Sequence, residues 1–195
     1  MLADVFQLLA RNLDAYFTNA PGGGNEPQSA VIKLLQQDGD EDAIKFPLNK
    51  VTPLLINVEE EGHLRPGDRF SRISVNGSRE SVFPDVRLNL YILFVSNFQE
   101  YADALNYLSL IVKYFQSHPV LDHQNTPELH EDIDKLIIEL KTLPINEQNE
   151  VWGALRSAYR PSLLYRVRML VFQAQPSVTA PGDVVGVQTT TGNFN

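Results

Sequence analysis

Three histidines and three carboxylates in one polar stretch are the residues whose chemistry comes nearest to that of a metal site. They are His118, Asp122, His123, Glu128, His130 and Glu131. Imidazole nitrogens and carboxylate oxygens are common protein ligands of zinc. No two of these histidines are four residues apart, the spacing that puts two ligands on one helix face, and the stretch has the composition of a loop. We interpret them as surface histidines, with a small metal-dependent enzyme built around His118 and His123 as the alternative.

Two further motifs fail the tests for ligand binding. The acidic turn at residues 38–42 has carboxylates at alternate positions, as calcium loops do, but its sixth position is Ala43 instead of glycine and its twelfth is Asn49 instead of glutamate. The glycines at residues 22–24 are not followed by the lysine and serine or threonine of a phosphate-binding loop. The chain has no Gly-x-Ser-x-Gly motif and no cysteine. These observations favour a protein without catalytic, cofactor-binding or metal-binding residues.

Arginine and tyrosine gather near the C-terminal end, and both are residues that protein interfaces favour. Arg156 and Arg160 are spaced by one helical turn, and Tyr159 lies between them. Arg166 and Arg168 alternate along one face of a predicted strand. We predict that these five residues contact another protein. In the alternative interpretation the tyrosines of this region are core residues, and the arginines pair with carboxylates of the same fold.

The charge of the chain is unevenly distributed. The net charge of the 195 residues is −8, which disfavours a nucleic-acid-binding protein because phosphate contacts depend on clustered lysine and arginine. Residues 151–195 contain four arginines and one aspartate, a balance of +3, so the first 150 residues carry −11. An acidic body with a basic C-terminal segment suits head-to-tail contact between copies of the chain.

The sequence has no features of a membrane protein. The N-terminus has neither the basic start nor the apolar run of a secretory signal. The longest wholly apolar stretch is Leu90–Val95, whereas a transmembrane helix needs roughly 20 residues. We therefore expect a soluble protein, and the lack of cysteine is compatible with a reducing cytoplasm.

Hydrophobic periodicity predicts three helices around a sheet. The helices are expected over residues 1–18, after Asn97, which has the capping-box spacing to Glu100, and after Asn146. Strands are expected at residues 30–35, 54–58, 70–75, 86–95, 136–141 and 162–173. The predicted fold class is α/β (α+β), a single mixed sheet flanked by about three helices in one domain of residues 1–173.

An extended arm, residues 174–195, is predicted to follow the domain. It contains prolines, glycines and threonines but no lysine or arginine. Val184, Val185 and Val187 form its apolar part, and we predict that they add a strand to the exposed sheet edge of a neighbouring copy.

Two stretches carry a resemblance to a known family. The first is Pro84-Asp85-Val86-Arg87-Leu88-Asn89-Leu90-Tyr91-Ile92-Leu93-Phe94 with its following helix and His118-Pro119-Val120-Leu121. The second contains Trp152-Gly153-Ala154-Leu155 and Tyr159-Arg160-Pro161-Ser162-Leu163-Leu164-Tyr165. Together with the leading amphipathic helix, these patterns resemble the cap (tail-terminator) proteins of extracellular contractile injection systems. The resemblance covers about residues 2–173.

The resemblance implies a structural role and a tail-terminator-like fold. It implies a homo-oligomeric ring of six copies that sits on the last layer of the inner tube protein, contacts the sheath protein and ends polymerisation. It implies no cofactor, and assembly in the bacterial cytoplasm as part of a particle that is released or anchored. A tube-to-baseplate adaptor of the same particle is the alternative.

Overall fold

The computed structural model describes residues 1–20, 30–35, 44–61, 71–73, 79–81 and 86–171. These residues belong to two units, each described by itself. The smaller unit contains β2 (Ser71–Ile73) and β3 (Arg79–Ser81), which pair antiparallel with Ser71 opposite Ser81. The strand β2 falls within the strand predicted at residues 70–75, whereas β3 was not predicted. In the described part of the chain, no helix is both long and apolar enough to cross a membrane.

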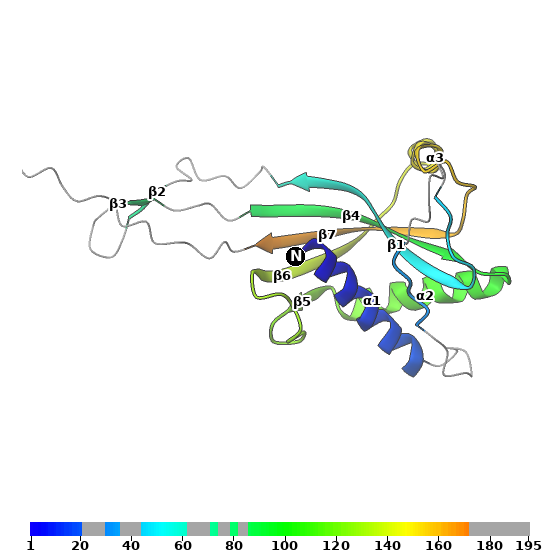
Figure 1. Ribbon diagram of the computed structural model, residues 1–195, viewed down its shortest axis with the longest axis horizontal. Coiled ribbons are helices and arrows are strands. Elements are labelled where there is room, and N and C mark those ends of the chain that lie inside the picture. Colours follow the sequence, from blue (N-terminus) through cyan, green and yellow to red (C-terminus); the bar gives the residue numbers. More distant parts are fainter. Residues whose placement is uncertain (21–29, 36–43, 62–70, 74–78, 82–85, 172–195) are drawn as a thin grey trace, which may run out of the picture. The chain divides into compact units, whose positions relative to one another are not determined.

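The larger unit is a five-stranded sheet with three helices (Figure 1). Its elements are α1 (Leu2–Asn19), β1 (Lys50–Glu60), β4 (Val86–Asn97), α2 (Tyr101–Ser117), β5 (Val120–Asp122), β6 (Ile133–Lys141), α3 (Ile145–Ala154) and β7 (Ser162–Val171). The strand order is β1-β4-β7-β6-β5. The predicted fold class, a sheet flanked by three helices, is confirmed.

The named strands of this sheet pair antiparallel throughout, whereas a mixed sheet was predicted. Among the residues that the structure describes, parallel pairing is confined to an isolated bridge between Ile32 and Val51, in which the Lys33 amide donates to the Val51 carbonyl at 2.9 Å. The strand predicted at residues 30–35 is therefore reduced to this bridge. The short strand β5 was not predicted, because three residues are too few to show an alternating pattern.

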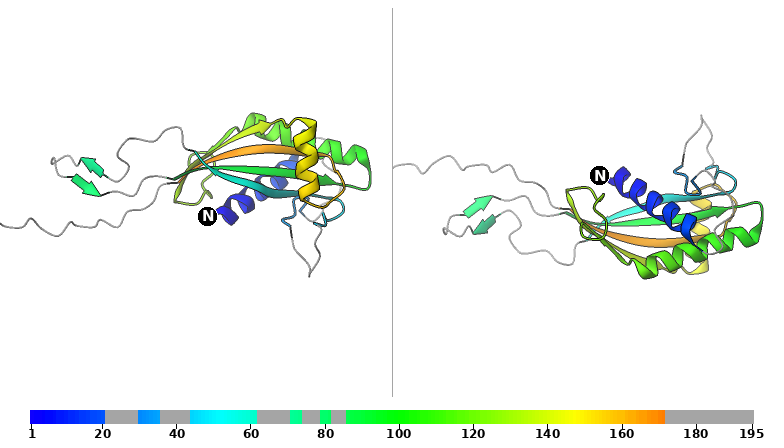
Figure 2. Two further views of the ribbon diagram at one scale, coloured as in Figure 1. Left: turned by 90° about the horizontal axis from the view of Figure 1, so that it is seen from above. Right: turned by 90° about the horizontal axis from the view of Figure 1, so that it is seen from below.

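One side of the sheet, which we call the helix face, is covered by α1 and α2 (Figure 2). The helix predicted over residues 1–18 is confirmed as α1, and its buried residues form one stripe: Val5, Leu8, Leu9, Leu13 and Phe17. It packs in one core with the inward residues of β4 and β7, which include Leu90, Ile92, Phe94, Val167 and Met169. This core holds α1 against the sheet.

The opposite side, which we call the α3 face, is covered only in part (Figure 2). Leu93 and Val95 of β4 form a second, smaller core with Leu164 and with Trp152 of α3, whose ring lies 6.0 Å from that of Phe46. Leu93 and Val95 are buried, so β4 is covered on both sides at its end. Towards the start of β4 the same face carries polar side chains.

Two local predictions about helix ends were wrong. Asn97 does not cap α2, which begins at Tyr101; it is the last residue of β4, and its side-chain amide donates to the carbonyls of Phe46 and Pro47 at 2.8 and 3.2 Å. The helix α3 ends at Ala154, and Arg156 has a positive φ of 49°. Arg156 and Arg160 are therefore not one helical turn apart.

Candidate functional site

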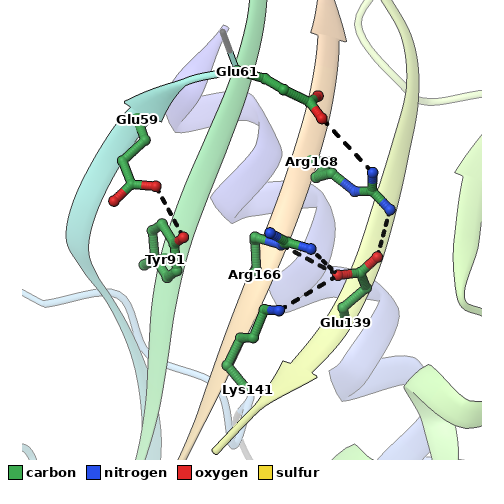
Figure 3. Close-up of polar contacts among 7 residues, drawn as sticks. All are labelled: Glu59, Glu61, Tyr91, Glu139, Lys141, Arg166 and Arg168. Atoms are coloured by element: carbon green, nitrogen blue, oxygen red, sulfur yellow. Dashed lines mark hydrogen bonds and ion pairs between the residues drawn. The ribbon is translucent and has the colours of Figure 1, made fainter. Parts of the chain in front are cut away.

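The polar half of the α3 face is organised in rows that cross the strands (Figure 3). The register aligns Asn57 of β1, Tyr91 of β4, Arg166 of β7 and Glu139 of β6. In the next row Arg168 lies between Asn89 and Ile137. Directly opposed residues on neighbouring strands lie within reach of each other's side chains. The sheet therefore brings together charges that are distant in the sequence.

Glu139 is the centre of this cluster. Its Oε2 atom accepts hydrogen bonds from Nε of Arg166 at 3.2 Å and from Nη2 of the same residue, and its Oε1 atom accepts one from Nη2 of Arg168. Lys141 Nζ lies 3.9 Å from Oε2 of Glu139, and Nη1 of Arg168 lies 3.9 Å from Oε1 of Glu61. Hydrogen bonds from Arg166 hold the pKa of Glu139 below its ordinary value, and the same contact raises the pKa of Arg166.

A second carboxylate, Glu59, orders the β1 side of the surface. Tyr91 donates its hydroxyl to Oε2 of Glu59 at 2.9 Å, and Asn57 Nδ2 donates to Oε1 at 3.1 Å. Burial raises the pKa of Tyr91, and the bond to Glu59 adds to this shift. Nε of Arg168 and Oδ1 of Asn89 are buried on this surface without a hydrogen-bond partner in the described part of the chain.

The predicted interface residues of the described part of the chain lie in two separate regions. Arg166 and Arg168 pair with Glu139 of the same fold, as the alternative interpretation held. Tyr159 and Arg160 are exposed in the segment after α3, where the Tyr159 ring lies 5.6 Å from that of Trp152. Arg156 is also exposed there. Val184, Val185 and Val187 lie outside the described residues.

The nearby tyrosine of β7, Tyr165, has a different environment from Tyr159. Only 2% of Tyr165 is exposed, and its ring packs against those of Phe94 and Phe115. Burial raises its pKa to about 12. For Tyr165 the core interpretation is confirmed, whereas Tyr159 is 62% exposed.

The histidines of the polar stretch have separate environments. His118 stacks on Tyr114 at 4.6 Å, and its Nδ1 lies 2.9 Å from the hydroxyl of Ser117. Nδ1 of His130 lies 3.6 Å from Asp132, and His123 is exposed. Within the described ranges no three histidine, aspartate or glutamate residues are grouped so that they could hold a metal ion. The acidic turn at residues 38–42 and the glycines at 22–24 lie outside those ranges.

Sequence reasoning missed Glu139, Glu59 and Tyr91 as members of the polar surface. The alternation of Glu139 and Lys141 with apolar residues did indicate that they share one face of a strand. It could not indicate that β6 lies beside β7, which is what places Glu139 opposite Arg166.

Comparison with protein families identifies the chain. The family model of the Pvc16 N-terminal domain matches residues 4–185. This chain belongs to that family. The predicted resemblance is therefore confirmed, and the match runs past residue 173 to include Val184 and Val185. A comparison with curated proteins gives no match.

Two solved structures share the fold of this Pvc16 N-terminal domain. One is the PVC sheath/tube terminator of an extracellular contractile injection system in its extended state, with a TM-score of 0.57, 16% identity, and coverage of 100% of this chain and 64% of that one. The other is the tube-terminating cap of the anti-feeding prophage, with a TM-score of 0.53 and 17% identity. That match covers 100% of this chain and 62% of the cap protein. The chain thus spans less than two thirds of the length of either protein. At these identities the likeness establishes the fold.

Proposed function

We propose that this chain is a structural subunit that terminates the inner tube and sheath of a contractile injection system. The observation that carries the proposal is its membership of the Pvc16 N-terminal family over residues 4–185. The likeness of its fold to a sheath/tube terminator and to a tube-terminating cap supports it. In this role the chain is not an enzyme and needs no cofactor.

A terminator must present one fixed surface to the end of a polymer and offer no equivalent surface for further growth. The polar half of the α3 face suits such a contact, because its charges are held in place by neighbouring strands before any partner arrives. Arg166 and Arg168 are 25% and 34% exposed while paired with Glu139. Preorganised charges contribute more to the register and specificity of a contact than to its affinity.

The proposed partners are copies of the chain, the tube protein and the sheath protein. We propose a closed ring of six copies, the number that the resemblance to cap proteins implies. A head-to-tail contact can form such a ring when its rotation closes. Arg156, Tyr159 and Arg160 are proposed contacts of this ring or of its partners, and their exposure supports the proposal. Nucleic acid and membrane are not partners in this role. We propose assembly in the bacterial cytoplasm, on a particle that is later released or anchored.

The test combines light scattering of the purified chain with electron microscopy after addition of tube protein. We expect a hexamer, or a monomer that forms six-fold rings at tube ends and stops their growth. A monodisperse monomer that leaves tube length and sheath attachment unchanged would refute the proposal. Rings at the baseplate end of the particle would instead identify the tube-to-baseplate adaptor.

A further inference from the structure

The outer edges of the five-stranded sheet differ in how their backbone groups are satisfied. The strand order places β1 at one edge and β5 at the other. Because β5 pairs with residues 135–137 of β6, the last part of β6 is an edge strand as well. An edge strand presents a row of backbone N–H and C=O groups that can pair with another chain, unless the protein blocks them.

The β1 edge is blocked at successive positions that face outward. Val51 is occupied, because its amide donates to the segment 31–33 at 3.0 Å and its carbonyl accepts from the same segment at 2.9 Å. Pro53, two residues further along β1, has no N–H group to donate. A register shift interrupts the strand just before Asn57, whose side-chain Oδ1 accepts from the Val58 amide at 2.9 Å. A strand added at β1 would therefore find its ladder of hydrogen bonds broken at each of these positions.

The β5 edge is blocked by the side chain of Asn125. Its Nδ2 atom donates to the Val120 carbonyl at 2.9 Å, and its Oδ1 atom accepts from the Asp122 amide at 3.0 Å. Backbone groups of alternate residues in a strand point to the same side, so Val120 and Asp122 present these groups together. The side-chain amide of Asn125 thus takes the place of a neighbouring strand.

The end of β6 lacks such protection. The Ile138 amide donates to the Pro119 carbonyl at 2.8 Å, so the backbone groups of Ile138 face the β5 side. The residue two positions later faces the same way, and the amide and carbonyl of Leu140 therefore point outward beyond the end of β5. Within the described ranges these two groups have no hydrogen-bond partner, and the Leu140 side chain is half exposed. An open edge with an exposed apolar side chain is suited to strand addition.

The partner that fits this edge is an extended and acidic segment of chain. An edge strand bonds the backbone of what it binds, so the partner must be extended. Lys141, the next residue of β6, is 37% exposed, and its Nζ lies 3.9 Å from Glu139 (Figure 3). This cation favours a carboxylate in the partner. Residues 174–195 carry no lysine or arginine, and their one acidic residue, Asp183, directly precedes Val184.

We infer that the segment 183–187 of one copy adds a strand to the end of β6 in a neighbouring copy, at Leu140. The inference rests on the proposed function and names the sheet edge through which copies of the chain join. Val171, at the end of β7, pairs with Ile133 at the start of β6, so it lies about 24 Å along the sheet from Leu140. The strand β5 occupies the edge between these two points. This separation favours a contact between copies over one within a chain.

Hydrogen exchange followed by mass spectrometry tests whether the edge is covered. The full chain is compared with the double variant Val184→Pro/Val185→Pro, which removes an amide facing β6 in either register of the added strand. We expect exchange in the peptide that contains Leu140 to become about tenfold faster or more in this variant. Exchange in the peptide that contains Val58 of β1 should not change. The matched control is Thr190→Pro/Thr191→Pro, which places two prolines elsewhere in the arm and should leave exchange at Leu140 as it is.

Cysteine trapping tests whether the strand comes from another copy, because the chain has no cysteine of its own. Leu140→Cys is mixed and oxidised with Val184→Cys or with Val185→Cys, each on a chain of different mass. One of these valines lies on the same side as Leu140 in either register, so we expect one mixed disulfide. Val58→Cys is the control, since Val58 is also an exposed apolar residue of an edge strand, and it should give none.

The outcomes separate this inference from the proposed function. Capped tubes in which neither valine cross-links to residue 140 would overturn the inference and leave the proposed function standing. Equal exchange at Leu140 in the full chain and the Val184→Pro/Val185→Pro variant would overturn it as well. So would a disulfide that forms only within a chain carrying both cysteines. A chain that neither forms rings nor stops tube growth would refute the proposed function, and the inference with it.

Discussion

The substitution Glu139→Gln tests whether the charge cluster on the α3 face stabilises the fold. It removes the carboxylate that Arg166 and Arg168 share, while keeping the shape of the side chain. Hydrogen bonds to charged groups contribute about 1.5–3 kcal/mol each when buried. Because the three side chains are 25–34% exposed, solvent screening reduces this figure. We expect a loss of about 1–2 kcal/mol in the free energy of unfolding at pH 7.

Thermal unfolding followed by circular dichroism is the assay. For a chain of this length the loss corresponds to a decrease of about 2–8 °C in Tm. The exposed Glu150 of α3 provides the control, and Glu150→Gln should change Tm by less than about 1 °C. A double-mutant cycle with Arg166→Met should give a coupling energy of about 1 kcal/mol between residues 139 and 166.

The pH dependence of the unfolding free energy gives a sharper test of the role of the Glu139 carboxylate. The folded-state pKa of Glu139 lies below its ordinary value of 4.5. The contribution of the carboxylate is therefore complete above pH 4.5 and is lost as the pH falls through the folded-state pKa. The difference in unfolding free energy between the wild type and Glu139→Gln should be constant from neutral pH to the mildly acidic range and then shrink. Equal stabilities at pH 7, or a difference that survives full protonation, would refute the assigned role.

Three further predictions concern the second core, the buried tyrosine and the arm. Trp152→Ala should lower the free energy of unfolding by about 3–5 kcal/mol, measured in urea by circular dichroism, because Trp152 closes the small core on the α3 face and is 5% exposed. In an alkaline spectrophotometric titration, one tyrosine with a pKa of about 12 should be missing from the Tyr165→Phe variant. Deleting residues 176–195 should leave the thermal unfolding of the domain unchanged and weaken ring or sheath attachment in electron micrographs. Unchanged attachment would count against strand addition by Val184, Val185 and Val187.

The parts of the fold that could be predicted are those in which a residue's environment follows from its near neighbours. The stripe of α1 and the alternation of β4 repeat over many residues, so each pattern is informative by itself. Asn97 shows where this fails. Locally it has the spacing of a helix cap, but its amide donates to the carbonyls of Phe46 and Pro47, about fifty residues away in the chain. A tertiary contact has replaced a local one.

The predicted site shows the same division between local and tertiary information. The sequence indicated that Arg166 and Arg168 share a strand face, which is a local property. Their partner depends on the register of β6 against β7, which no local pattern encodes. Likewise, the four-residue spacing of Arg156 and Arg160 does not place them on one helix face. The helix α3 ends at Ala154, and Arg156, two residues later, has a positive φ.

The pairing of Arg166 and Arg168 changes how the charge imbalance of the chain should be understood. Four arginines made the C-terminal segment basic, but Arg166 and Arg168 share the carboxylate of Glu139, and Arg168 also lies 3.9 Å from Glu61. The basic balance of residues 151–195 is therefore offset in part within the same sheet, by carboxylates that lie outside that segment. The attraction between an acidic body and a basic C-terminal segment is therefore weaker than the composition of the two parts indicates.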